Sequence, residues 1–69
     1  MIRKGSNVKW KWGSGTAEGK VLDTYDKEVS KTIKGSKITR KGSSDDKALY
    51  IEQSDGDKVL KLESEVEKL

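Results

Sequence analysis

Apolar and polar residues alternate in short runs along the chain, and glycine-containing segments separate these runs. This pattern predicts short β-strands joined by turns. Over residues 8–12 the alternation places Val8, Trp10 and Trp12 on one face of a strand and the intervening lysines on the other. A second extended segment is expected over residues 16–25, where Gly19 predicts a bulge or a close approach by another strand.

Residues 29–40 are predicted to form a lysine-rich hairpin. A two-residue turn of type II′ at residues 35–36 would set the register between its strands. This register aligns similar side chains across the hairpin: Ile33 with Ile38, Thr32 with Thr39, Lys34 with Lys37, and Lys31 with Arg40. The matched isoleucines and threonines favour this interpretation.

A second hairpin is predicted over residues 49–62, with Asp55-Gly56 as a type I′ turn. The expected pairs are Ile51 with Leu60 and Leu49 with Leu62, with Tyr50 and Val59 on the opposite face.

Beyond this hairpin, the spacing of Ser64 and Glu67 matches a capping box and predicts a short helical turn. The elements together predict an all-β fold, a small antiparallel barrel of five or six short strands with a C-terminal helical turn. One domain is expected over residues 1–69, because a chain of 69 residues buries too little surface for more.

The composition excludes several kinds of site. The chain has no cysteine and no histidine, so disulfides, thiolate nucleophiles, imidazole bases and the usual zinc ligands are ruled out. The glycines at 13, 15 and 19 lack the spacing of a phosphate-binding loop. A small core also leaves little stability for a strained catalytic site. We therefore expect a non-enzymatic binding module without a cofactor or a metal.

No apolar stretch approaches the roughly 20 residues of a membrane span, and the first residues lead directly into polar sequence. The absence of cysteine favours a reducing compartment. We expect a cytoplasmic protein without a membrane partner, and a monomer.

Charge is distributed unevenly along the chain. Residues 1–41 carry 11 Lys and Arg against 4 Asp and Glu, a net charge of +7, whereas residues 42–69 carry 4 against 8, a net charge of −4. A basic half attracts nucleic acid or another acidic partner. The acidic half can instead dock onto the basic half within the fold, or repel wrong partners.

The lysine-rich hairpin and the aromatic residues are the candidate ligand contacts. Like charges that face each other across a hairpin are destabilising, which suggests that phosphates of a ligand offset them. The alternative is that these lysines protect an edge strand from aggregation. The two tryptophans could pack in the core or offer a stacking platform. Tyr50 is the candidate aromatic contact for a bound peptide. The candidate residues are Lys31, Lys34, Lys37, Arg40, Lys41, Trp10, Trp12 and Tyr50.

Two functions follow from these residues. The leading hypothesis is a module that contacts nucleic acid or another acidic partner through the basic hairpin, with a tryptophan as a stacking surface. The alternative is an adaptor that binds a protein or peptide in a groove, with the lysines serving solubility.

Three segments also resemble a known family: Val8-x-Trp10-x-Trp12-Gly13-x-Gly15-x-Ala17-x-Gly19-x-Val21, Thr32-Ile33-x-Gly35-x-x-Ile38-x-Arg40, and Ile51-Glu52-Gln53-x-Asp55-Gly56-Asp57-x-Val59-Leu60-Lys61-x-x-Ser64-Glu65. Their order and spacing resemble the hypervirulence-associated Tudor-like domain, a family of short microbial proteins. The resemblance covers nearly the whole chain and implies a Tudor-like barrel of the SH3 type. It implies no particular activity, because the family has no established biochemical function and a fold alone does not supply one.

Overall fold

The computed structural model describes residues 2–69, which form strands and one 3-10 turn. The all-β antiparallel fold and the C-terminal helical turn are confirmed. Seven strands are present in the described part of the chain instead of five or six, because a two-residue strand follows the turn. The elements are β1 (Asn7–Trp12), β2 (Gly15–Tyr25), β3 (Glu28–Ile33), β4 (Ser36–Lys41), β5 (Ala48–Gln53), β6 (Lys58–Leu62), η1 (Glu63–Glu65) and β7 (Glu67–Lys68).

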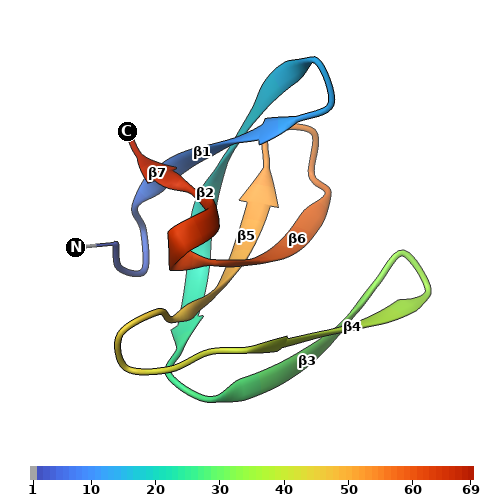
Figure 1. Ribbon diagram of the computed structural model, residues 1–69. Helices are drawn as coiled ribbons and strands as arrows, with labels where there is room; N and C mark the ends of the chain where they lie inside the picture. Colours follow the sequence, from blue (N-terminus) through green and yellow to red (C-terminus); the bar gives the residue numbers. More distant parts are fainter. Residues whose placement is uncertain (1) are drawn as a thin grey trace.

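The strands form two sheets. One has five strands in the order β6-β5-β2-β1-β7, and the other contains only β3 and β4. Figure 1 shows the β3–β4 hairpin projecting from the five-stranded sheet as a separate ribbon. The hydrogen-bonded strands of residues 2–69 therefore do not close into one barrel, although β2 is long enough to pair with both β1 and β5.

The core lies on the inner face of the five-stranded sheet. Val8 and Trp10 are buried there, as the alternation of β1 predicts, together with Val21 of β2 and with Leu49 and Ile51 of β5. Each of these strands contributes alternate residues to one cluster, so the sheet is held by a single apolar face.

Gly19 is a point of close approach between β2 and β5. A Cβ atom at this position would lie 2.5 Å from Ile51 Cγ2 and 2.7 Å from the Glu52 carbonyl oxygen. The irregularity of β2 lies further along, between Val21 and Asp23, where the register with β5 shifts. Of the two roles predicted for Gly19, the close approach is confirmed and the bulge falls at a different place.

The predicted register of the β3–β4 hairpin is wrong. The two turn residues are Lys34 and Gly35, which have φ angles of 51° and 78°. Positive φ at both central residues is typical of a type I′ turn. Gly35 adopts this conformation without steric cost, and Lys34 adopts it although it is not a glycine. The observed pairs are Glu28 with Lys41, Val29 with Arg40, Ser30 with Thr39, Lys31 with Ile38, Thr32 with Lys37, and Ile33 with Ser36. No lysine faces another basic residue, so the expected repulsion across the hairpin is absent.

The register of the β5–β6 hairpin is also wrong, by one residue. Its loop has three residues, because the Gln53 N–H donates to the Asp57 carbonyl at 2.7 Å and Gly56 adopts a φ of 91°. Ile51 consequently pairs with Val59, and Tyr50 pairs with Leu60. A shift of one residue moves a side chain to the other face, so Val59 lies on the core side with Ile51 and not with Tyr50.

The C-terminal turn forms with different capping residues from those predicted. The backbone N–H of Leu62 donates to Glu65 Oε1 at 2.8 Å, so Glu65 takes the role expected of Glu67. Ser64 lies inside the turn, where its N–H and its hydroxyl both donate to the Asp46 carboxylate at 2.8 Å. Glu67 is extended in β7 beside β1. Within residues 2–69, no helix has the length and hydropathy needed to cross a membrane.

Candidate ligand-binding groove

The ends of three hairpins surround one groove, which we call the three-hairpin groove. It lies between the β1–β2 turn, the β3–β4 turn and the β5–β6 loop, and its volume is about 690 Å³. In Figure 1 these three hairpin ends lie on the same side of the molecule, away from the two termini. Its lining includes Trp12, Ala17, Ile33, Lys34, Asp57 and Val59.

Trp12 is the exposed aromatic side chain of the groove. Its residue is 67% exposed, whereas Trp10 on the same face of β1 is 4% exposed. The difference follows from the register, because Trp10 pairs with Ala17 inside the sheet and Trp12 pairs with Gly15 beside the turn. An indole in this position contributes little to the core and leaves a large flat apolar surface available to a ligand.

Apolar side chains from different elements continue this surface. Ala17 and Val59 are partly buried and pack against the core, and Ile33 is half-buried at the end of β3. Since Ala17 and Val59 rest on the core, this part of the lining is fixed by the sheet itself. A concave site with apolar lining and a few polar groups is the usual form of a ligand pocket.

An ion pair joins two of the hairpins that line the groove. Lys34 Nζ lies 2.8 Å from Asp57 Oδ2. The hydrogen bond to Asp57 is the main cause that raises the Lys34 pKa above its ordinary value of 10.5, and the charges of Asp57 and Asp55 add to it. The contact fixes the end of the β3–β4 hairpin to the β5–β6 loop.

Replacing Lys34 with a neutral residue should destabilise the protein at a pH below the Lys34 pKa, where the lysine is charged. Because folding raises the Lys34 pKa, its stabilising effect is complete below 10.5 and is lost as the pH rises through the folded-state value. We expect Lys34→Gln to lower the thermal midpoint slightly at pH 8, and the difference from the unmodified protein to fade above pH 10.5. Lys37→Gln is the matched control, and thermal melts across this pH range are the measurement. A difference that persists at all pH values would assign the effect to packing.

Lys31 is held between two tyrosine rings. Its Nζ lies 5.2 Å from the ring centre of Tyr25 and 5.0 Å from that of Tyr50, within the range of a cation–π contact. The Tyr25 side chain is the main cause that raises the pKa of Lys31 above its ordinary value of 10.5; desolvation lowers it, and the charges of Tyr25, Tyr50 and Asp23 raise it further. The space between these rings is therefore occupied by the chain's own ammonium group.

The basic and acidic halves of the chain pair with each other in the fold. Arg40 Nη2 lies 3.2 Å from Glu65 Oε2, and Lys9 Nζ lies 3.8 Å from Glu67 Oε2. With the Lys34–Asp57 pair, these contacts connect residues 1–41 to residues 42–69. The uneven charge distribution thus serves internal docking, one of the two roles expected for the acidic half.

The structure separates the candidate residues of the basic hairpin. Lys31 and Arg40 lie on its inner side, where they contact tyrosines and Glu65, and Lys34 pairs with Asp57 at the turn. Lys37 and Lys41 are exposed on the other side, and Lys41 pairs with Glu28 across the strands. The five basic residues do not form one surface.

The aromatic candidates are also separated. Trp10 belongs to the core, which confirms the packing alternative for it, and Tyr50 is half-buried against Lys31. Trp12 alone among the aromatic candidates combines high exposure with the groove. Sequence reasoning missed Ile33, Asp57 and Val59 as groove residues, because their position depends on the two registers that were predicted wrongly. The exposed end of the alternating run at Trp12 was the available signal.

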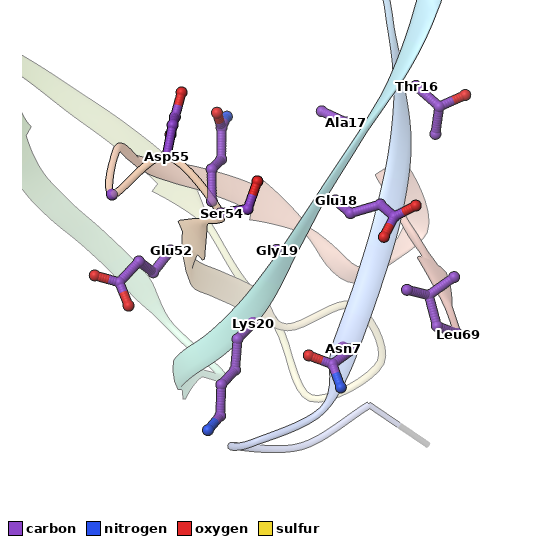
Figure 2. Close-up of a pocket in the computed structure, with 12 residues that line it drawn as sticks. Asn7, Thr16, Ala17, Glu18, Gly19, Lys20, Glu52, Ser54, Asp55 and Leu69 are labelled. Carbon is purple, nitrogen blue, oxygen red and sulfur yellow. The ribbon is translucent and has the colours of Figure 1, made fainter.

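A larger and shallower hollow lies on the outer side of β2, near the start of β1 and the β5–β6 loop. Its volume is about 1050 Å³, and its lining is mostly polar. Figure 2 shows the side chains of Lys20, Glu52 and Asp55 leaving the backbone in different directions, so they do not converge on one point. This hollow lacks an aromatic anchor. Among the described residues, no three His, Cys, Asp or Glu side chains are placed to hold a metal ion.

Comparison with known proteins identifies the family. Residues 5–66 match the family described as "Hypervirulence associated proteins TUDOR domain". No curated protein and no solved structure matches the chain. Tudor-like domains are typically non-catalytic binding modules, which agrees with a small all-β fold whose exposed groove is lined by one indole and several aliphatic side chains. The match covers most of the chain, and the protein therefore belongs to the hypervirulence-associated Tudor domain family.

Proposed function

We propose that this domain binds a protein through a peptide segment that enters the three-hairpin groove and packs on Trp12. The exposure of Trp12 is the observation that carries the proposal. Tryptophan is enriched among the few residues that dominate binding energy at protein interfaces. Ala17, Ile33 and Val59 supply the apolar contacts beside it, and the Lys34–Asp57 pair supplies polar groups at the rim.

The groove supports peptide binding better than the basic hairpin supports nucleic-acid binding. A polyanion interface needs several unpaired cations on one surface. Lys31, Lys34 and Arg40 are engaged with tyrosines and carboxylates. The like-charge argument for phosphate contact also depended on a register that is wrong.

A peptide selection tests the proposal directly. A displayed library of random linear peptides is selected on the unmodified domain, and enriched peptides are titrated while amide and indole signals are recorded. We expect shifts at Trp12, Ile33, Val59 and Asp57. Trp12→Ala should weaken binding about 30-fold or more, the effect of losing an interfacial hot spot. Its thermal midpoint should change little, because the side chain is exposed.

Two controls separate the alternatives. Lys37→Glu should leave peptide affinity unchanged, because Lys37 lies on β4 away from the groove. A single-stranded oligonucleotide is titrated in parallel at low salt. Peptide-induced shifts confined to signals outside the groove would overturn the proposal. Oligonucleotide binding that Trp12→Ala leaves intact and Lys37→Glu abolishes would overturn it in favour of the basic surface.

A further inference from the structure

The outer edge of β1 is only partly covered. Strand β7 pairs with it at Val8 and Lys9, and the Leu69 N–H donates to the Asn7 carbonyl at 2.9 Å. In an antiparallel pair, the backbone groups of alternate residues point to the same edge. Those of Lys11 therefore point to the same edge as the Asn7 carbonyl that accepts from Leu69, and no strand of residues 2–69 pairs with Lys11 there.

A hollow lies beside this open part of the edge. Its volume is about 390 Å³, and it is bounded by Trp10, Lys11 and Thr16 on one side and by residues 64–67 on the other. The hollow therefore lies beside β1 where β7 would extend at its N-terminal end, if η1 did not turn the chain away from β1. The hollow is thus next to the paired strands β1 and β7.

The side chain of Trp10, which borders this hollow, carries a buried donor without an acceptor in residues 2–69. The residue lines the hollow and is 4% exposed, yet its indole Nε1 has no hydrogen-bond partner among the described residues. Buried donors in folded proteins nearly always have an acceptor. A carbonyl oxygen brought to the hollow by an extended backbone would supply one.

The charges beside the edge indicate which side chains such a ligand would carry. Lys9 faces Glu67 of β7 in the observed register, with the charged atoms 3.8 Å apart. Lys11 lies on the same side of β1 and has no ion-pair partner within residues 2–69. An acidic residue opposite Lys11 would repeat the arrangement that β7 already makes with Lys9.

We infer that the edge of β1 at Lys11 binds an extended acidic peptide segment, which adds to the sheet antiparallel to β1 and continues the line of β7. The residue opposite Lys11 exchanges two backbone hydrogen bonds with it, and its acidic side chain faces the lysine ammonium. This binding mode is strand addition to a free sheet edge. It does not depend on the three-hairpin groove, so either site can fail without the other.

The test uses a synthetic peptide, acetyl-Val-Glu-Val-Glu-Val-amide, and a form N-methylated at both glutamates. The unmethylated peptide should slow exchange of the Lys11 amide and shift the Trp10 indole N–H signal, and leave the Trp12 indole signal unchanged. Methylation removes the backbone donors and should weaken binding about 10-fold or more. Equal binding by both forms would show charge attraction alone and overturn the inference.

Charge reversal supplies the matched variants. Lys11→Glu should lose the glutamate peptide and bind the corresponding lysine peptide, whereas Lys37→Glu, the same charge change on β4, should keep the original preference. Trp10→Phe removes the indole donor and keeps an aromatic ring in the core. It should lower the affinity for the peptide without changing where the peptide binds. Sedimentation of the free protein tests whether a second copy of the chain occupies the edge of β1 instead of a peptide. A concentration-dependent dimer that protects the Lys11 amide would overturn the peptide assignment.

Discussion

Replacing Leu49 with alanine is expected to lower the free energy of unfolding by about 2–5 kcal/mol. Leu49 of β5 is fully buried in the core, and removing its methyl groups leaves a cavity that the small core cannot refill. A domain of this size has only about 3–10 kcal/mol in total. The variant should therefore be partly unfolded at moderate temperature. Urea unfolding followed by Trp10 fluorescence, in a Trp12→Phe background, measures the change.

Leu69→Ala is the control for the same chemical change at the surface. Leu69 is 58% exposed, so the unfolding midpoint should move little. Equal losses at the two positions would contradict the burial that the structure gives to Leu49.

Gly42→Ala is the second change with a large expected effect. A Cβ atom at Gly42 would lie 2.6 Å from the Tyr25 carbonyl oxygen and 2.7 Å from the Ala48 amide nitrogen. Both are backbone atoms, so no side-chain rotation can relieve the contact. Gly42 also donates its N–H to the Lys27 carbonyl at 3.2 Å. We expect a loss of about 1–3 kcal/mol, as for overpacked cores, and a displaced β3–β4 hairpin.

Gly15→Ala tests whether crowding is the cause. A Cβ atom at Gly15 meets its nearest neighbour, the Trp12 carbonyl oxygen, at 4.0 Å. This variant should melt within a few degrees of the unmodified protein, and amide spectra should show the hairpin in place. A Gly42→Ala variant as stable as Gly15→Ala would mean that the Tyr25 and Ala48 backbones separate easily.

The sequence was sufficient to predict six of the seven strands of residues 2–69 and the face of β1 that meets the core. Alternation of period two determines a face directly, and for β1 the face with Val8 and Trp10 was predicted correctly. Pairing partners depend instead on the length and type of each turn. At Lys34-Gly35 the chain places a lysine at positive φ, a conformation that glycine at position 35 alone does not predict. At the β5–β6 loop, Asp55-Gly56 suits both a two-residue and a three-residue connection.

The candidate site was predicted less well than the fold for the same reason. Trp10 and Trp12 were both candidates, and the sequence did not predict which of them is exposed, because that depends on where β1 ends. The groove around Trp12 depends on Ile33, Asp57 and Val59, which come from hairpins with shifted registers. The individual partners of Lys34 and Arg40 could not be assigned from the sequence, because they lie in the acidic half, far along the chain. Such long-range pairs leave no local pattern in a sequence.

The direct pairing of Tyr25 with Ala48 makes the β3–β4 hairpin an insertion between two neighbouring strands. A short turn could connect β2 to β5 at this point without altering the register of the five-stranded sheet. Residues 26–47 are thus a cassette that the sheet carries, attached through Lys31, Lys34 and Arg40. A change within this cassette would alter the wall of the groove that Ile33 and Lys34 form, while the strand that carries Trp12 stays the same.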